Sequence, residues 1–456
     1  MRWPEDFAYH EQDYSPNSLP LPFVVRAEMS RLRLVIDADA RLSARHRSYF
    51  ELLATREGSG VDLLDVSLPG DAPAGTDSWR LRELDGTYSL ELVTEESRSL
   101  RRVRPHLNTF VDRLATERGL PRDAAFRAHA RYEAAFALDT DLFVSDREPL
   151  FGWRRDGRMF SCRPQEAMAV LGLYQRLHGP VHLLGRIPIR CRAYETAMEA
   201  SYALLPEMHG LFDRAGVASA EWAKATSMLV SARTRVERVL HDRDHLIARS
   251  MVAGRNLPFS TAEALVERIA LNLSGLFDAL ARAINLAMGL GVADHRCSFK
   301  RKDFRRTLPG RGLQEAAGDA QLQALLEVLA LLRNTIHHEA LGAGMSTDRR
   351  ADRFLEPLAV LPLAESEKFR GECQRLGRTS RWLLDLPGSV DGDLGAMARA
   401  LPMAEDLLEL AISHCRRILQ VADWPGHASP SSTPGFLWAD EPAVVEQVME
   451  LYGLSG

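Results

Sequence analysis

The stretch LQALLEVLALLRNTIHHEAL, residues 322–341, joins a hydrophobic seam to an abruptly polar end. Six apolar residues recur at the three- and four-residue spacing that places side chains on one face of an α-helix. These residues are Leu322, Leu325, Leu326, Leu329, Leu332 and Ile336. Arg333, Asn334, His337 and His338 lie within six positions of one another at its end. Polar groups beside a buried seam cost desolvation energy unless they have partners. The stretch therefore predicts a core helix of a bundle whose polar end is either a functional site or a polar patch bonded to a neighbouring helix or to solvent.

Long helical patterns surround this stretch in the second half of the chain. Five segments carry helical periodicity. They are residues 219–251, 260–290, 313–341, 364–386 and 395–424. We expect residues 207 to 425 to be nearly all helix, followed by a Pro/Ser-rich linker and a short C-terminal helix.

In the first part of the chain, segments with strand patterns alternate with segments with helical patterns. Short apolar runs predict strands at 32–37, 141–146 and 158–162, and a helix beginning with proline is expected at 164–177. An Asp-Gly pair inside the alternating segment 77–93 predicts a β-hairpin. Strands alternating with helices favour a mainly parallel sheet within the first 165 residues.

These two sequence patterns predict an α/β domain followed by an all-α domain. A chain of 456 residues is long enough for two or three domains. We expect an N-terminal tail at 1–20, an α/β domain at 21–185, a helical domain at 186–424, and a linker with the C-terminal helix at 425–456.

Composition favours a soluble protein of the cytoplasm. Hydrophobic residues make up 46% and charged residues 26%, and the net charge of −5 argues against a protein that is basic throughout. The five cysteines are scattered without a CxxC pair, which argues against a disulfide scaffold or a zinc site.

Residues 1–14 have no apolar signal region. The apolar stretch 271–292 is interrupted by Asp278 and Arg282, so we expect an amphipathic helix there and no membrane span.

The segment CSFKRKDFRRTLPGRG, residues 297–312, is the strongly basic cluster of the chain and holds two of its four lysines. One interpretation is a solvated loop. The other is a surface that contacts RNA phosphates. Its contacting residues would be Lys300, Arg301, Lys302, Arg305 and Arg306.

The hexapeptide RNTIHH at 333–338 resembles the signature of the HEPN family, helical bundles of which many are ribonucleases. That signature is an arginine, four to six residues and a histidine, with a polar residue such as asparagine often following the arginine. The resemblance implies a metal-independent endoribonuclease in which His338 is the general acid or base. It also implies that Arg333 stabilises charge on the phosphate and that Asn334 orients His338. His337 remains the alternative catalytic histidine.

The same resemblance implies partners and products. The RNA 2′-hydroxyl would be the nucleophile, so this site needs no cofactor and leaves a 2′,3′-cyclic phosphate. Such sites are usually built from two motifs that face each other across a dimer, and a single motif in the chain implies a homodimer. A toxin or an anti-phage defence effector, held by an antitoxin or another regulatory partner, is the expected biological role.

The α/β half offers a second candidate site. Asp37 and Asp146 close two apolar runs, and the carboxyl ends of parallel strands are where ligands gather. Residues 122–151 resemble the C-terminal part of PIN-like nuclease domains, with Asp123 opening a helix. The resemblance implies that Asp37, Asp123 and Asp146 bind Mg²⁺ or Mn²⁺.

Two alternatives stay open at this point. The further acid of the PIN-like pattern has no single position, because Glu83, Glu95 and Glu96 all fit. The α/β domain could equally serve recognition or assembly without catalysis, since a fold does not carry chemistry by itself. The chain as a whole would then be a nucleic-acid or nucleotide sensor, or a nuclease that depends on metal.

Overall fold

A computed structural model gives the structure of the 456-residue chain, and most of the chain can be described from it. The described residues are 32–37, 40–57, 59–64, 78–84, 87–93, 100–103, single positions between 112 and 135, 140–146, 152–153, 159–208, 211, 214–215, 219–250, 262–338, 341–347, 355–384, 395–425, 427–428 and 441–454. The chain divides into two compact units. Residues 1–191 and 450–456 form the first unit, and residues 192–449 form the second.

A five-stranded sheet forms the centre of the first unit. Its order is β2-β1-β6-β8-β7; the first four strands are parallel and β7 is antiparallel to β8. The strands are β1 (Leu32–Ile36), β2 (Val61–Leu64), β6 (Leu142–Val144), β7 (Gly152–Trp153) and β8 (Phe160–Cys162). All of β6 and β8 is buried, as expected for parallel strands covered on both faces. The predicted α/β character of this half is confirmed.

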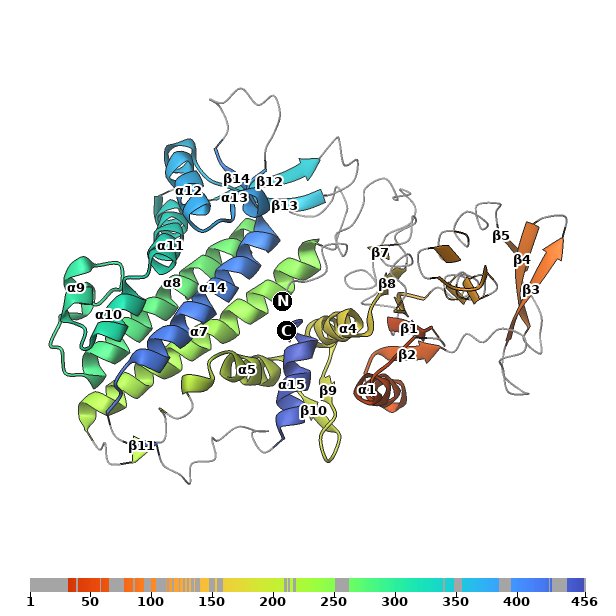
Figure 1. Ribbon diagram of the computed structural model, residues 1–456, viewed down its shortest axis with the longest axis horizontal. Coiled ribbons are helices and arrows are strands. Elements are labelled where there is room, and N and C mark those ends of the chain that lie inside the picture. Colours follow the sequence, from red (N-terminus) through yellow and green to blue (C-terminus); the bar gives the residue numbers. More distant parts are fainter. Residues whose placement is uncertain are drawn as a thin grey trace. The chain divides into compact units, whose positions relative to one another are not determined.

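Two helices and a hairpin accompany this sheet (Figure 1). They are α1 (Ala44–Thr55), α4 (Pro164–His178), β9 (Val181–Leu183) and β10 (Ile189–Cys191). Pro164 occupies the first position of α4, where its missing N–H costs nothing. The C-terminal residues of the chain pack on this helix: Arg176 Nη1 donates to the Leu451 carbonyl at 2.8 Å, and its guanidinium lies over the ring of Tyr452.

A separate antiparallel sheet completes the first unit. It consists of β3 (Ser78–Leu84), β4 (Thr87–Val93) and β5 (Leu100–Val103), in that order. Leu84 pairs with Thr87, so only two residues connect β3 to β4. The hairpin predicted from the Asp-Gly pair is confirmed, because a two-residue connection of this composition matches the twist of the strands that it joins.

Four long helices form the core of the second unit (Figure 1). They are α7 (Ala220–Ser250), α8 (Ala262–Ala287), α11 (Ala320–His338) and α14 (Ala400–Val421). Helix α8 packs against the other three. The predicted leucine seam of α11 is buried, with Leu322, Leu325 and Leu332 fully inaccessible to solvent. The seam therefore holds α11 in the bundle by apolar burial.

Shorter helices surround this bundle. They are α5 (Ala193–Leu204), α9 (Lys302–Thr307), α10 (Arg311–Ala317), α12 (Leu363–Arg375), α13 (Thr379–Trp382) and α15 (Pro442–Leu451), the last of which crosses the boundary between the two units. The predicted helix 313–341 is divided into α10 and α11. The break has a local cause: the Asp319 carboxylate accepts hydrogen bonds from the backbone N–H groups of Gln321 and Leu322 and so caps the start of α11.

The expectation that residues 207 to 425 are nearly all helix is wrong, because they contain a three-stranded antiparallel sheet. Its strands are β12 (Gly342–Thr347), β13 (Leu355–Val360) and β14 (Met397–Arg399). The short β11 (Arg214–Ala215) also pairs with β15 (His427–Ala428). Leu358 and Ala359 of the central strand are buried. Strand β12 contains Gly342 and Gly344 and β13 contains Pro357, residues that are depleted in strands, and β14 has three residues, too few to show a period.

Among the described helices, α8 alone is long and apolar enough to cross a membrane by length and composition. Most of its apolar window is buried against the rest of the protein. That burial is typical of the central helix of a bundle, which must be apolar on several sides.

Candidate functional site

Helix α11 changes from core to surface at Arg333. Leu331 and Leu332 are buried, whereas Arg333 and Asn334 are exposed. The helix continues to His338, so the remaining residues of the motif belong to its last two turns. The side chains of residues 335–338 lie outside the described residues, and the catalytic role of His338, like that of His337, stays a prediction.

Arg333 forms an ion pair with Asp278 of the neighbouring helix α8. Arg333 Nη1 lies 3.5 Å from Asp278 Oδ2, and the two side chains are 45% and 38% exposed. Burial raises the pKa of the Asp278 carboxyl, although the guanidinium groups around it act in the opposite direction. A carboxylate that has lost part of its water is a costly partner unless positive charge surrounds it.

Two more arginines act on the same carboxylate. Arg235 of α7 and Arg282 of α8 both interact electrostatically with Asp278. We call Arg235, Asp278, Arg282 and Arg333 the Asp278 cluster; its three guanidinium groups and one carboxylate carry a net charge of +2. Burial lowers the pKa of Arg235, and repulsion from Arg238, Arg282 and Arg333 lowers it further. The cluster thus concentrates positive charge that its own carboxylate does not neutralise.

The cluster also has unused hydrogen-bond donors. The Nε atoms of Arg235 and Arg282 are buried, and neither has a hydrogen-bond partner among the described residues. A buried donor without a partner costs free energy that a bound acceptor would recover. Guanidinium groups bind the oxygens of phosphates through charge-assisted hydrogen bonds. The arrangement is therefore suited to an anion with several oxygens.

The sequence had marked only Arg333 in this cluster. Asp278 and Arg282 were visible as two charges four residues apart in an apolar helix, and they were interpreted only as a sign of amphipathicity. Charges at this spacing lie on one face, which was the available signal for a shared site. Arg235 lies in the arginine-rich stretch of α7, where nothing in the local pattern separates it from its neighbours.

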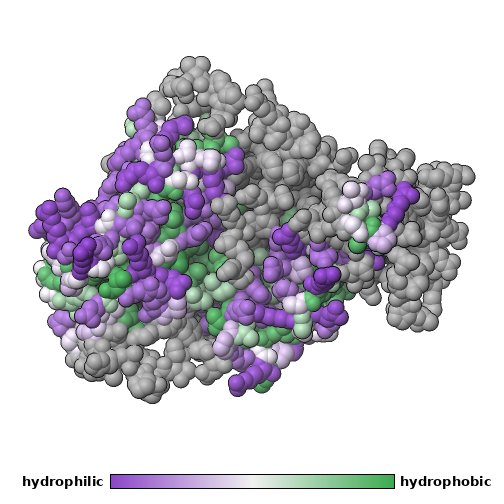
Figure 2. Space-filling view, viewed as in Figure 1, coloured by the Kyte–Doolittle hydropathy of each residue, from purple (hydrophilic) through white to green (hydrophobic). Residues whose placement is uncertain are grey.

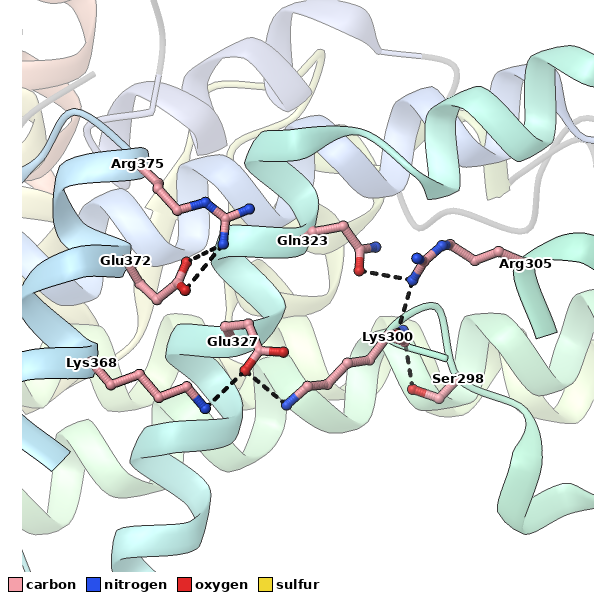
Figure 3. Close-up of polar contacts among 8 residues, drawn as sticks. All are labelled: Ser298, Lys300, Arg305, Gln323, Glu327, Lys368, Glu372 and Arg375. Atoms are coloured by element: carbon pink, nitrogen blue, oxygen red, sulfur yellow. Dashed lines mark hydrogen bonds and ion pairs between the residues drawn. The ribbon is translucent and has the colours of Figure 1, made fainter. Parts of the chain in front are cut away.

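The basic segment 297–312 is largely engaged in contacts within the protein (Figure 3). Glu327 of α11 lies 3.1 Å from Lys300 and 3.3 Å from Lys368. Arg305 Nη1 donates to the Gln323 side chain at 2.8 Å and to the carbonyls of Phe299 and Lys300. These contacts fix the loop before α9 on α11, which is a structural role.

The remaining charges of this segment divide into a paired and an unpaired group. Arg301 and Arg296 both bind Asp303, at 3.0 and 2.8 Å, and these bonds hold the pKa of the Asp303 carboxyl well below its usual range. Lys302 and Arg306 are exposed and form no ion pair within the described part of the chain. Arg305 binds only neutral acceptors, so three of the five predicted RNA-contacting residues, Lys302, Arg305 and Arg306, have no carboxylate partner among the described residues.

The acids of the α/β unit occupy the edge predicted for them. Asp37 directly follows β1 and Asp146 follows β6, and these strands are adjacent and parallel. The Asp37 carboxylate is buried, lies 2.8 Å from Arg131 Nε and accepts a hydrogen bond from Ser145 Oγ at 3.0 Å. A carboxylate already neutralised by a buried guanidinium is less available to a cation.

Of the other acids of the PIN-like pattern, only Glu83 lies within the described residues. Asp123, Glu95 and Glu96 lie outside them, and Glu83 is part of β3 in the separate antiparallel sheet. Within the residues that the structure describes, no three His, Cys, Asp or Glu side chains form a group that could hold a metal ion.

Comparisons of the chain with protein-family models, with curated proteins and with solved structures find no match. The resemblances of RNTIHH to the HEPN signature and of residues 122–151 to PIN-like domains therefore rest on those residues alone. What the chain does has to be argued from its side chains.

Proposed function

We propose that the chain is a metal-independent endoribonuclease of the HEPN type, with Arg333, Asn334 and His338 as its catalytic residues. The observation that carries the proposal is the position of Arg333. It follows a fully buried leucine seam, and its half-exposed guanidinium belongs to a cluster with a net charge of +2. A rigid helix that presents an arginine from such a cluster is suited to stabilising charge on a phosphate in the transition state.

The proposed reaction is an internal transesterification. His338 removes the proton of the RNA 2′-hydroxyl, and the 2′-oxygen attacks the adjacent phosphorus. The bond from phosphorus to the 5′-oxygen breaks, and that oxygen takes a proton from a second acid. The products carry a 2′,3′-cyclic phosphate and a 5′-hydroxyl. The nucleophile is part of the substrate, so the site needs neither a metal ion nor a bound water.

A homodimer would supply the second acid, because each chain has one such motif. Asn334 is four residues before His338 and shares its helix face, from which its amide can orient the imidazole. We further propose that the first unit is PIN-like, which its four parallel strands support. The role of a cytoplasmic toxin or defence effector, restrained by an antitoxin or another regulator, belongs to the same proposal.

Cleavage of single-stranded RNA in the presence and absence of EDTA tests this function. We expect cleavage in EDTA, cyclic phosphate ends by mass spectrometry, and loss of cleavage in His338→Ala with an unchanged melting temperature. His337→Ala, made in parallel, decides between the two histidines. Cleavage that EDTA abolishes would transfer the activity to the acids of the α/β unit. Cleavage by the doubly substituted His337/His338 variant would exclude this helix as the nuclease.

A further inference from the structure

We propose that Arg235 and Arg282, together with Arg333, bind a backbone phosphate of single-stranded RNA. The inference rests on the proposed function for the identity of the ligand, and it assigns two binding residues that lie outside the hexapeptide 333–338. The three side chains come from α7, α8 and α11 and share Asp278 as their only carboxylate within the cluster.

The first argument is charge. Three guanidinium groups that interact with one carboxylate repel one another, and the lowered pKa of Arg235, caused first by burial and then by Arg238, Arg282 and Arg333, reports that repulsion. A bound phosphodiester would bring a negative charge to the cluster and reduce its net charge from +2 to +1. Binding would thus relieve a repulsion that exists in the free protein.

The second argument is hydrogen bonding. Arg235 and Arg282 each keep a buried Nε donor that has no hydrogen-bond partner among the described residues. Elsewhere in the same unit, the buried Arg243 is bound to Glu405 at 3.0 Å. The Nε atoms of Arg235 and Arg282 have no such acceptor among the described residues, and neither has that of Arg233, so the two donors favour a ligand only together with the net charge of the cluster. Two oxygens of a phosphate can accept parallel hydrogen bonds from the planar guanidinium group.

The third argument is the close approach of Arg235 to α8. Its guanidinium lies against Gly275, where an added Cβ would stand 2.5 Å from Arg235 Cζ and 2.9 Å from Nε. Only glycine leaves this space, although glycine weakens a helix by roughly 0.5–1 kcal/mol relative to alanine. Glycine at position 275 therefore allows the Arg235 guanidinium to lie against α8, and a larger residue would make this flexible end of the side chain shift.

This close approach provides a test that keeps every charge in place. Gly275→Ala would displace the Arg235 guanidinium while improving helix propensity. Gly371→Ala on α12 is the matched control, because a Cβ there meets nothing within 4 Å. Arg235→Gln and Arg282→Gln remove the charges directly, and Arg311→Gln is their control, since Arg311 is highly exposed on α10 and paired with Glu315.

The experiment measures fluorescence anisotropy of a labelled 2′-O-methyl RNA oligonucleotide, which can bind but has no 2′-hydroxyl nucleophile. We expect Arg235→Gln, Arg282→Gln and Gly275→Ala each to raise Kd by about tenfold, while both controls leave it unchanged. For the two arginine variants, the slope of log binding constant against log salt should become shallower by about 0.7 for each phosphate that the protein no longer neutralises. A purely structural role would not change that slope.

The outcomes separate this inference from the proposed function. It is overturned if the wild-type protein does not bind the methylated RNA, or if the three variants bind it with the wild-type Kd and salt slope. If those variants bind normally while cleavage of unmodified RNA still depends on His338, the function stands and the inference fails. If the variants lose binding but unmodified RNA is never cut, the inference stands and the proposed ribonuclease function fails.

Discussion

Two basic regions of the helical unit differ in how their charges are compensated. The segment 296–306 has many cationic side chains, and Figure 2 shows a strongly hydrophilic surface around α9, yet Asp303 binds two arginines and Glu327 binds two lysines. Lys302, Arg305 and Arg306 of that segment have no carboxylate partner among the described residues. In the Asp278 cluster, Arg333 pairs with Asp278, and Arg235 and Arg282 interact with it electrostatically. The comparison teaches that the density of basic residues in a sequence does not show which of them are free to bind a ligand. Pairing within the fold decides it.

The largest expected difference between the two regions concerns RNA cleavage. Arg333→Ala removes a guanidinium that we place at the reacting phosphate, and losing one such group typically lowers kcat by about 10²–10³-fold. Arg301→Ala removes a cation that Asp303 already neutralises, and we expect a change of at most about threefold on the surface-pair scale. Initial rates on one RNA substrate measure both. Equal losses in the two variants would abolish the distinction between the regions.

Asp278→Asn should strengthen RNA binding without lowering the stability of the protein. The substitution keeps the shape of the side chain and removes the carboxylate that holds Arg333 at 3.5 Å. RNA affinity should rise severalfold, because the three arginines lose their internal competitor. The free energy of unfolding should not fall, because the raised pKa of Asp278 means that its ionised carboxylate is disfavoured in the folded protein despite the arginines around it.

Anisotropy with the methylated RNA would measure the RNA affinity, and urea unfolding at two salt concentrations would measure the free energy of unfolding. Weaker binding by Asp278→Asn would mean that the main effect of the carboxylate is to position the arginines for RNA, and that its competition with RNA for these arginines is the smaller effect.

Glu327→Gln should make the paired region resemble the Asp278 cluster. Burial alone would raise the pKa of Glu327, but its bonds to Lys300 and Lys368 outweigh burial and lower it. Without that carboxylate, both lysines would be free to contact phosphates, and RNA affinity should rise by about twofold. Double substitution of Lys300 and Lys368 by Gln is the control, since it removes the cations themselves. An unchanged Kd in Glu327→Gln would show that this surface does not face the RNA.

Local patterns were sufficient to predict much of the fold. The leucine seam of α11 and the two-residue hairpin between β3 and β4 follow from neighbouring residues, because helical periodicity and turn chemistry act over a few positions. The strands β12 to β14 could not be read in the same way. β12 contains glycines and β13 a proline, which are depleted in strands, and β14 pairs with β13 from about 40 residues earlier in the chain.

The candidate site was only partly visible in the sequence for the same reason. Arg333 belongs to a recognisable hexapeptide, but Asp278 is 55 residues away from it and Arg235 lies on a third helix. Only the packing of α7 and α11 against α8 brings these charges together. The pairing within the basic segment could not be predicted either, because no local pattern places Glu327 beside Lys300 and Lys368.

Mild acidification is expected to give the smallest effect, and it should act on the two regions differently. Burial raises the pKa of Asp278, so this carboxyl takes up a proton at a higher pH than an ordinary aspartate. Its protonation removes the negative charge of the cluster while the arginines stay charged, so RNA binding should tighten as the pH falls toward the range in which aspartates take up protons. Asp303 behaves in the opposite way, because its bonds to Arg301 and Arg296 lower its pKa and keep it ionised over that range.

The control for this last prediction is Asp278→Asn, which has no proton to gain at that position. Other groups, histidines above all, also titrate between pH 7 and 5 and would tighten RNA binding in both proteins. The informative quantity is therefore the ratio of the two Kd values at each pH. We expect the advantage of Asp278→Asn over the wild type to shrink as the pH falls, because the wild-type carboxyl becomes neutral as well. A ratio that stays constant would mean that Asp278 remains ionised beside its arginines, and that its pairing in the free protein is as complete as that of Asp303.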